Sequence, residues 1–183
     1  MLTATGYAVL GLLSFGEALS GYDLKRWADH SLRYFFWSPA QSAIYRELRR
    51  LEELGYVRAL GPSQGPRGRQ RYRITATGRR ALESWVASSN HAPPVVKDHT
   101  LLKVWLGHVA DRDSLLELVE LERKATEELL EEIHYSAARA EEADLTYAAL
   151  VERCCGRLAS ARAAALQELA EGLHEEPSTR VRS

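Results

Sequence analysis

One segment, Ser38 to Gly55 (SPAQSAIYRELRRLEELG), constrains the fold of this chain more than any other. Ser38 suits an N-cap, Pro39 suits the first helical position, where its missing N–H costs nothing, and Gly55 suits the end. At about 100° per residue, one side of this helix is apolar and the other sides carry polar and cationic groups. The apolar side consists of Ala40, Ile44, Leu48, Leu51 and Leu54. The segment therefore predicts a helix that packs on one side and can contact DNA on the other.

Amphipathic helices with outward arginines are more often solvated surface helices than nucleic-acid readers, so the neighbouring segments decide between the two. Two short strand-like runs, 56–60 and 71–75, follow the helix and flank GPSQGPRGRQ, a loop rich in Gly, Pro and Arg. Because successive strand side chains point to opposite faces, Tyr72 can face the domain while Arg71 and Arg73 face solvent or phosphate. A helix followed by a basic hairpin favours contact with phosphate.

The net charge of −1 conceals an asymmetry between the two halves of the chain. Residues 1–89 carry 13 Lys and Arg against 7 Asp and Glu, whereas residues 90–183 carry 11 against 18. A basic first half fits a polyanionic partner, and an acidic second half would be repelled by the same phosphates. The charge pattern therefore indicates that any nucleic-acid contact belongs to the first half.

Shorter helices are expected to complete the first half. They are predicted at 5–14, from Ser20 to about residue 30, and at 78–87 with Thr77 as the N-cap. The segment 31–37 (SLRYFFW) holds four aromatic residues, which are more often packing residues than a stacking surface, although exposed ones could line a ligand site. The following SSNHAPP contains a Pro pair that forbids continuing the helix, so a domain boundary is expected there.

The second half is predicted to be helical throughout. The segment 97–109 is too apolar on all sides for a lone surface helix, and two long helices follow, from Asp111 to about Glu142 and from Asp144 to about Leu173. The expected stripe of the first long helix is Leu115, Leu118, Val119, Ala125, Leu129 and Ile133. That of the second, at coiled-coil spacing, is Val151, Cys154, Leu158, Ala161, Ala165 and Leu169. One short partner cannot cover both stripes, so a helical hairpin that pairs with a second chain is expected.

Three segments form a joint signature in the first half: AVLGLLSFGEALSGYDLKRW, SPAQSAIYRELRRLEELGYV and RQRYRITATGRRAL. The matching features, in order, are the Gly21-Tyr22 pair, the register from Ile44-Tyr45 to Leu51, Leu54-Gly55-Tyr56-Val57, and Tyr72 to Ala81. Together they resemble the winged helix-turn-helix domain of the PadR family of bacterial transcriptional regulators, over residues 4–87. The second half is similar in architecture, though not in motif, to the larger C-terminal dimerisation domain of virulence-activator-like members.

We therefore expect a mostly α fold with a small β hairpin. A winged helix-turn-helix DNA-binding domain is expected at 1–89, a helical dimerisation domain at 95–174, and a disordered tail at 175–183. The resemblance further implies a homodimer that binds a two-fold operator on double-stranded DNA, most often as a repressor that a small molecule releases. One module covers only a half-site, so a dimer would read two half-sites about one helical turn, or a multiple of it, apart.

The resemblance also assigns roles to individual side chains, because the N-terminus of the recognition helix enters the major groove. The side chains expected to reach base edges are Gln41, Ser42 and Arg46. Those expected to hold phosphates are Lys25, Tyr45, Arg49, Arg67, Arg69 and Arg71.

An effector site is expected at the domain boundary, since apolar clefts between domains are common ligand sites. Its candidate residues are Trp37, Trp85, Trp105 and Tyr147, each of which could instead belong to a core or an interface. The expected effector is small and apolar or aromatic.

The sequence gives no positive support for an enzyme. No two of the six histidines stand four residues apart, no Gly-rich phosphate loop follows a strand, and no nucleophile lies in an elbow motif, so we expect no catalytic residue, metal or cofactor. Cys154 and Cys155 are adjacent and so pair poorly with each other; packing thiols are expected, with an intersubunit disulfide or a redox sensor as the alternative. No apolar run approaches the roughly 20 residues of a membrane span, so a cytoplasmic protein is expected, without membrane contact.

Three alternatives to a repressor remain open. An activator of the same family would share every feature above. A protein-interaction module would leave the basic face solvated, and a redox or metal sensor would use Cys154, Cys155 and a histidine. Neither of the last two explains why positive charge concentrates on the helix and the hairpin together.

Overall fold

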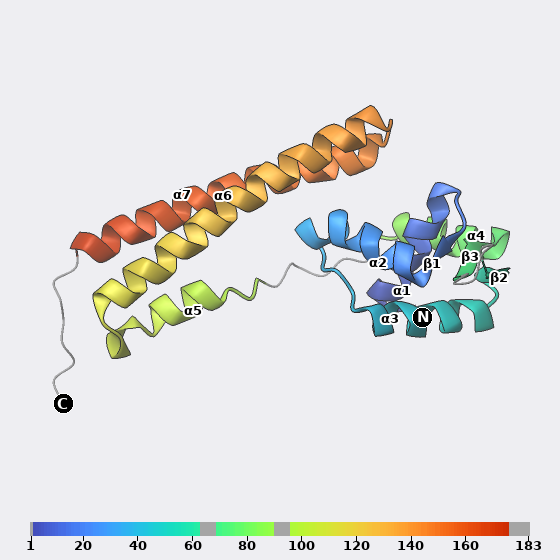
Figure 1. Cartoon of the computed structure of the whole chain (residues 1–183), viewed down its shortest axis with the longest axis horizontal. Coiled ribbons are helices and arrows are strands. Elements are labelled where there is room, and N and C mark those ends of the chain that lie inside the picture. The colour runs from blue at the N-terminus through green and yellow to red at the C-terminus, as the bar shows by residue number, and fades with distance from the viewer. Residues whose placement is uncertain (1, 63–68, 90–95, 176–183) are drawn as a thin grey trace. The chain divides into compact units, whose positions relative to one another are not determined.

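The computed structural model of this chain describes residues 2–62, 69–89 and 96–175. Contacts divide the chain into two compact units, Met1–Ala92 and Pro93–Ser183, which we call the winged unit and the helical unit. The winged unit packs helices around a small sheet, whereas the described part of the helical unit consists of helices (Figure 1). The expected fold class, mostly α with a small β hairpin, is confirmed.

The described residues of the winged unit form four α-helices and three strands. The helices are α1 (Ala4–Leu12), α2 (Gly21–His30), α3 (Gln41–Glu53) and α4 (Ala76–Val86), with 3₁₀ turns η1 (Leu13–Phe15) and η2 (Leu32–Tyr34). The strands are β1 (Leu19–Ser20), β2 (Val57–Pro62) and β3 (Gln70–Ile74). The sheet is antiparallel in the order β1-β3-β2. The predicted hairpin is therefore present, and β1, which was not predicted, adds a third strand on the side of β3.

The core of the winged unit lies where α1 and α2 pack on α3. Ile44 and Leu48, on the inner side of α3, are at most 1% exposed, as the helical spacing predicted. On β3, Tyr72 joins this core while Arg71 and Arg73 are exposed, as strand alternation predicted. The inner side of α3 is thus committed to packing, and its outer side is open to other contacts.

The N-terminus of α3 differs from the prediction. The helix begins at Gln41 rather than at Pro39, with Ala40 as its N-cap and no side chain bonded to its first N–H groups. Ser38 does not cap it: the hydroxyl donates a hydrogen bond to Asp29 and accepts one of 2.8 Å from the Nζ of Lys25. An ionised partner makes a stronger hydrogen bond than a neutral one, which explains why the charged pair on α2 takes the serine.

Two other local predictions were wrong. Thr75, not Thr77, caps α4, and its Oγ1 accepts a hydrogen bond of 3.0 Å from the N–H of Gly78. Ala40 and Leu54, which were placed on the packing side of α3, are both exposed, Leu54 to 47%; they are the N-cap and the C-cap that flank the helix. Gly55 does end the helix, with a φ of 70° that lies in the left-handed region favoured by glycine.

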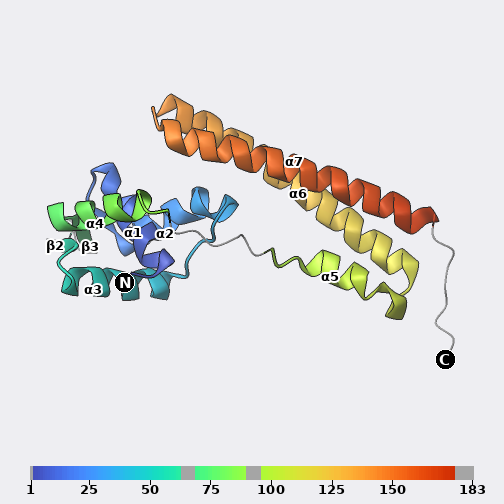
Figure 2. The same cartoon turned by 180° about the vertical axis from the view of Figure 1, so that it is seen from behind.

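The described residues of the helical unit form α5 (His99–Trp105), the 3₁₀ turn η3 (Gly107–Val109), α6 (Arg112–Glu142) and α7 (Thr146–Glu175). The two long helices run side by side as a hairpin (Figures 1 and 2). Asp111 caps α6 as predicted, but Asp144 does not start α7: it lies in the connecting turn with a φ of 56°. In the described residues, no helix combines the length and apolarity of a membrane span.

The interior of the α6–α7 hairpin combines aliphatic side chains, mainly from α6, with small side chains, mainly from α7. On α6, Leu115, Val119 and Ile133 are buried as predicted. Ala125 and Leu129, predicted on the same stripe, are exposed, and Thr126 is buried beside Ala125. On α7 the buried positions are Ala149, Glu152, Cys155, Gly156, Ala159 and Leu166. The two helices therefore approach each other over alanine, glycine and cysteine.

The predicted stripe of α7 does not face α6. Its members Val151, Cys154, Leu158, Ala161 and Ala165 are all exposed, and Leu158 reaches 68%. The prediction of an apolar seam was correct in spacing, but the side that meets α6 is displaced by about one residue. Helical periodicity identifies an apolar stripe but does not show which surface packs against it. The smaller side chains at the buried positions of α7 allow α6 to approach more closely.

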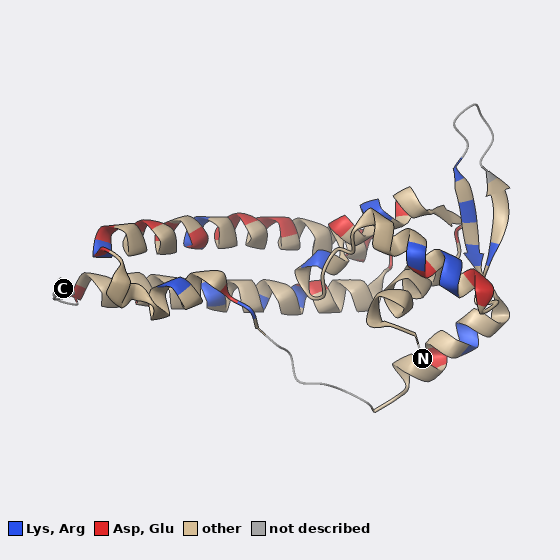
Figure 3. Ribbon diagram, turned by 90° about the horizontal axis from the view of Figure 1, so that it is seen from below, with Lys and Arg blue, Asp and Glu red and all other residues tan. Residues whose placement is uncertain are grey.

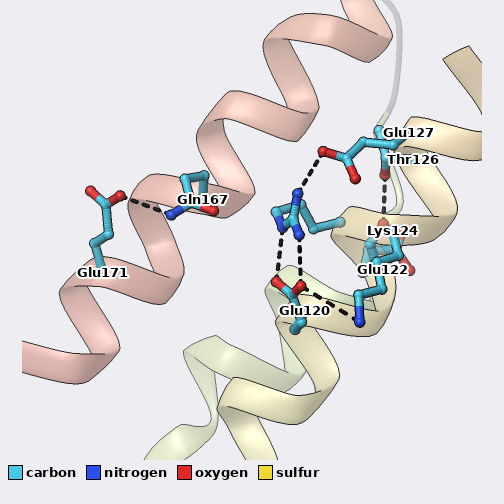
Figure 4. A network of polar contacts seen from close by, with 8 residues as sticks. Glu120, Glu122, Lys124, Thr126, Glu127, Gln167 and Glu171 are labelled. Atoms are coloured by element: carbon cyan, nitrogen blue, oxygen red, sulfur yellow. Dashed lines mark hydrogen bonds and ion pairs between the residues drawn. The ribbon is translucent and has the colours of Figure 1, made fainter.

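Charged side chains link α5 to the α6–α7 hairpin. Arg162 on α7 donates to Asp98, the N-cap of α5, and its Nη2 lies 2.8 Å from Glu122 on α6. The hydrogen bond from Arg162 is the main cause that holds the pKa of Asp98 below its ordinary value. Next to Glu122 in the sequence, the guanidinium of Arg123 donates hydrogen bonds to Glu120 and Glu127 of the same helix. Figure 4 labels both glutamates.

Candidate nucleic-acid interface

The outer side of α3 holds the three residues expected to read bases. Ser42 and Arg46 are exposed, so both can reach a partner without rearrangement of the core. Gln41 is half-buried, and its Nε2 donates a hydrogen bond of 2.9 Å to the carbonyl of Gly21 on α2. Ser42 and Arg46 therefore form the open part of the surface, while Gln41 links α3 to the start of α2.

A second contact joins α3 to the same point of α2. A Cβ placed on Gly21 would lie 2.5 Å from Cε1 of Tyr45, so the tyrosine ring packs directly on the glycine backbone. Any larger residue at position 21 would push the ring away. Tyr45, expected to hold a phosphate, is 36% exposed and so combines packing with access to solvent. Arg49, one turn further along α3, is exposed.

Tyr22 is a residue of this surface that sequence reasoning missed. It is 45% exposed, and the guanidinium carbon of Arg69 lies 3.9 Å from the centre of its ring. Arg69 immediately precedes β3, so this contact brings the base of the hairpin to the start of α2. The Gly21-Tyr22 pair was noted only as part of a family resemblance; the signal available in the sequence was an aromatic residue beside a glycine at a helix start.

The predicted phosphate ligands of the hairpin differ in their surroundings. The Nε and Nη2 of Arg71 donate hydrogen bonds of 2.9 and 2.6 Å to the carbonyl of Ala18, which clamps β3 to the segment before β1. Arg67 lies outside the described residues, and Arg73 is exposed. Arg71 is thus already engaged within the fold, whereas Arg69 stands at the edge of the surface.

Lys25, also expected to hold a phosphate, is part of a polar cluster that shapes the approach to α3. Its ammonium group pairs with Asp29 one turn later and donates to Ser38 just before α3. Hydrogen bonds from Lys25 and then from Ser38 are the main causes that lower the pKa of Asp29. The cluster links α2 to the segment that leads into α3 and leaves Lys25 partly exposed.

The charges of the two units differ in sign where they are most concentrated. Arg recurs on β3 and on α3, and β2 carries Arg58, whereas Asp and Glu dominate α6 (Figure 3). Polyanion binding therefore belongs to the winged unit on electrostatic grounds, because the same phosphates would be repelled by α6.

The four aromatic residues of the expected effector site have separate surroundings. Trp85 stacks on Tyr7 with ring centres 4.4 Å apart, and Trp37 stacks on Phe36. Trp105 ends α5, close to the start of α6, and is 79% exposed, while Tyr147 stands at the start of α7 and is 86% exposed. Between the last two lies the length of α6, about 45 Å at about 1.5 Å per residue. Trp105 and Tyr147 of one chain therefore do not share a pocket.

A hollow of about 590 Å³ lies elsewhere, on the winged unit, between α2, β1 and the start of β3. Trp27 and His30 line one side of it and Arg69 and Arg71 the other. None of the four expected effector residues lines it. Sequence reasoning gave no signal for this hollow, because its walls come from segments about 40 residues apart.

Side chains suited to bind a metal ion do not cluster in the part of the chain that the structure describes. Over residues 2–62, 69–89 and 96–175, no three His, Cys, Asp or Glu side chains gather as metal ligands would. Both thiols are free; Cys154 is exposed, and burial is the main cause that raises the pKa of Cys155. A thiol kept protonated by burial is a poor nucleophile and a poor metal ligand.

Comparison with known proteins identifies the same region. Residues 9–84 match the model of the transcriptional regulator PadR-like family. The negative transcriptional regulator PadR of Bacillus subtilis is 37% identical over 100 residues, which cover 54% of this chain and 54% of that protein. The chain thus spans about half the length of this curated relative.

Two solved structures of Bacillus subtilis PadR share the fold of this chain. The structure in complex with operator DNA has a TM-score of 0.82 at 24% identity and covers 94% of this chain and 99% of its own. The structure in complex with p-coumaric acid has a TM-score of 0.71 at 24% identity, with coverage of 93% and 96%. At this identity the likeness establishes the fold.

Proposed function

We propose that this chain, whose residues 9–84 match the model of the transcriptional regulator PadR-like family, is a homodimeric repressor. It binds a two-fold operator on double-stranded DNA in the cytoplasm and is released by a small apolar or aromatic effector. An activator using the same surface is the alternative mode of action. The relative named a negative regulator supports repression.

One observation carries the proposal: the outer side of α3 and the base of the hairpin form one exposed basic surface. Ser42 and Arg46 are open on α3, and Arg69 is held beside the start of α2, which α3 contacts through Gln41. A recognition helix presents base-reading side chains, while a wing supplies phosphate contacts that fix its register. The related PadR bound to operator DNA supports this use of the fold.

The proposed homodimer is supported by apolar side chains of the helical unit that the rest of the unit leaves exposed. Leu150, Val151 and Leu158 lie on the exposed side of α7, and Leu101, Leu102 and Trp105 are exposed on α5. Large apolar side chains left exposed on a helix mark interaction sites on soluble proteins when they gather in a patch. A second copy supplies a matching surface by symmetry, and a dimer also supplies the second recognition helix that a two-fold operator needs.

The effector part of the proposal rests on the aromatic residues and on the relative solved with p-coumaric acid. We expect a planar aromatic compound to reach Trp37, Trp85, Trp105 or Tyr147, to quench tryptophan fluorescence and to weaken operator binding. Titration of aromatic acids, followed by fluorescence and by DNA binding in the same buffer, tests this. If no such compound changes either signal, the effector part is wrong while DNA binding stands.

The DNA-binding role is tested with two arginine variants and the duplex upstream of the protein's own gene. Arg46→Ala is expected to cost about 1–3 kcal/mol of binding free energy and to relax preference at one base step. Arg69→Ala is expected to weaken binding to all sequences and to reduce the salt dependence by about one phosphate contact. Arg80→Ala, an exposed arginine of α4, is the matched control and should change neither.

Gel shifts against specific and random duplexes at several salt concentrations provide the measurement. Equal, sequence-independent losses for the Arg46 and Arg69 variants would contradict the assigned roles. A wild-type protein that prefers no duplex over random competitor would contradict the function itself.

A further inference from the structure

Tyr22 stands where three DNA-facing elements of the winged unit come together. Its ring carries the guanidinium of Arg69 at 3.9 Å, well within the range of a cation–π contact. The two residues come from α2 and from the base of the hairpin and are far apart in sequence. Yet both remain exposed, so neither is required to complete the core.

The backbone beneath Tyr22 is fixed by α3 and by the start of α2. Gly21, its neighbour, accepts a hydrogen bond from Gln41 and supports the ring of Tyr45. Ser20 closes a capping box with Asp23: the N–H and the hydroxyl of Ser20 both donate to the carboxylate of Asp23. A helix start held in this way cannot shift relative to α3 without breaking several contacts.

In the part of the chain that the structure describes, β3 pairs with β1 at two positions that follow Arg69. Leu19 pairs with Tyr72 and Ser20 with Arg71, and Arg71 clamps the carbonyl of Ala18. Arg69 lies before β3 and beyond this pairing, so the backbone ladder does not fix its side chain. The ring of Tyr22 supports its guanidinium, whose charge also helps to lower the pKa of Asp23 on α2.

We propose that Tyr22 is a positioning residue for DNA binding, which holds the guanidinium of Arg69 at a set place relative to α3. This rests on the proposed function. Ordering a long flexible side chain before binding removes part of the entropy loss that binding would otherwise incur. The hairpin and α3 then present their charges to one duplex in a fixed register, with the ring rather than the hydroxyl of Tyr22 responsible.

A double-mutant cycle in the full-length chain tests the inference. Tyr22→Ala is expected to weaken binding to the upstream duplex about three- to tenfold, and Arg69→Ala by a similar factor. The double variant should bind no more weakly than Arg69→Ala alone, because the tyrosine acts through the arginine. Tyr22→Phe and Tyr22→Trp keep a ring and should bind within about twofold of wild type.

Controls separate positioning from stability. Tyr34→Ala removes a similar contact, since Arg33 lies 5.0 Å from the Tyr34 ring, and it should leave DNA affinity unchanged. Thermal melting should be the same for wild type and Tyr22→Ala, because the side chain is exposed. Additive losses in the double variant, or a loss in Tyr22→Phe equal to that in Tyr22→Ala, would overturn the inference while leaving DNA binding intact. A wild type that binds no duplex would overturn both.

Discussion

The two units of this chain are both rich in apolar residues, yet they bury them differently. In the winged unit the interior consists of large aliphatic side chains such as Leu10, Leu24 and Leu48, each fully buried. In the hairpin of α6 and α7, alanine, glycine and cysteine occupy buried positions beside Val119, Ile133 and Leu166, while Leu158 and Tyr147 face outward. The helical unit thus mixes small and large side chains in its interior and leaves large ones on α7 exposed.

This difference between the two interiors corresponds to the two roles proposed for the units, DNA binding and dimerisation. A DNA-reading module needs a rigid platform, because base contacts tolerate little displacement, and a dense aliphatic core provides it. A dimerisation module needs apolar surface that one chain leaves open, and small residues inside a hairpin leave the large ones for the partner. The three following variants test this contrast in order of expected effect.

The largest effect is expected from the interior of the winged unit. Leu48→Ala should lower the free energy of unfolding by about 2–5 kcal/mol, because a fully buried leucine leaves a cavity that the core cannot close. Leu60→Ala, 44% exposed on β2, should cost far less and serves as the control. Denaturant unfolding followed by circular dichroism measures the free energy of unfolding of both variants. Equal losses for Leu48→Ala and Leu60→Ala would contradict the expected difference between the buried and the exposed leucine.

The second effect should appear in self-association rather than in folding. Leu158→Asp is expected to weaken dimerisation at least about tenfold, or about 1.4 kcal/mol, because it would bury an unpaired charge at the proposed seam. Gln167→Asp, exposed about half a helical circumference away, should leave the dimer intact. Sedimentation velocity over a concentration series measures dimerisation of both variants. A Leu158→Asp variant that dimerises like wild type would show that the dimer interface does not include this side of α7.

The smallest effect is a pH dependence inside the hairpin. Burial is the main cause that raises the pKa of Glu152 above its ordinary value of 4.5, and a hydrogen bond from Ser136 opposes it only in part. The folded state therefore holds the proton more tightly, so stability falls as pH rises from about 4.5 through the raised pKa. Glu152→Gln should flatten that part of the curve of melting temperature against pH. Glu171→Gln, exposed on the same helix, should leave it unchanged.

Local sequence signals predicted much of the fold correctly. The spacing of Ile44, Leu48 and Leu51 gave the packing side of α3, and Gly55 gave its end, because helical period and left-handed glycine act over a few residues. Alternation on β3 placed Tyr72 inward in the same way. Signals that depend on competition between partners were less informative: Ser38 could cap α3 but bonds to the Lys25–Asp29 pair instead.

The sequence by itself determined where the helices and the hairpin lie, that basic charge concentrates in the first half, and that α7 carries an apolar stripe. Tertiary structure alone decided which stripe of α7 meets α6, that Arg71 clamps Ala18, and that Tyr22 lies under Arg69. The physical reason is the distance along the chain over which each kind of interaction acts. Helical period, capping and strand alternation are set by residues a few positions apart, whereas these three contacts depend on which of several chemically suitable partners the packing of distant segments brings close.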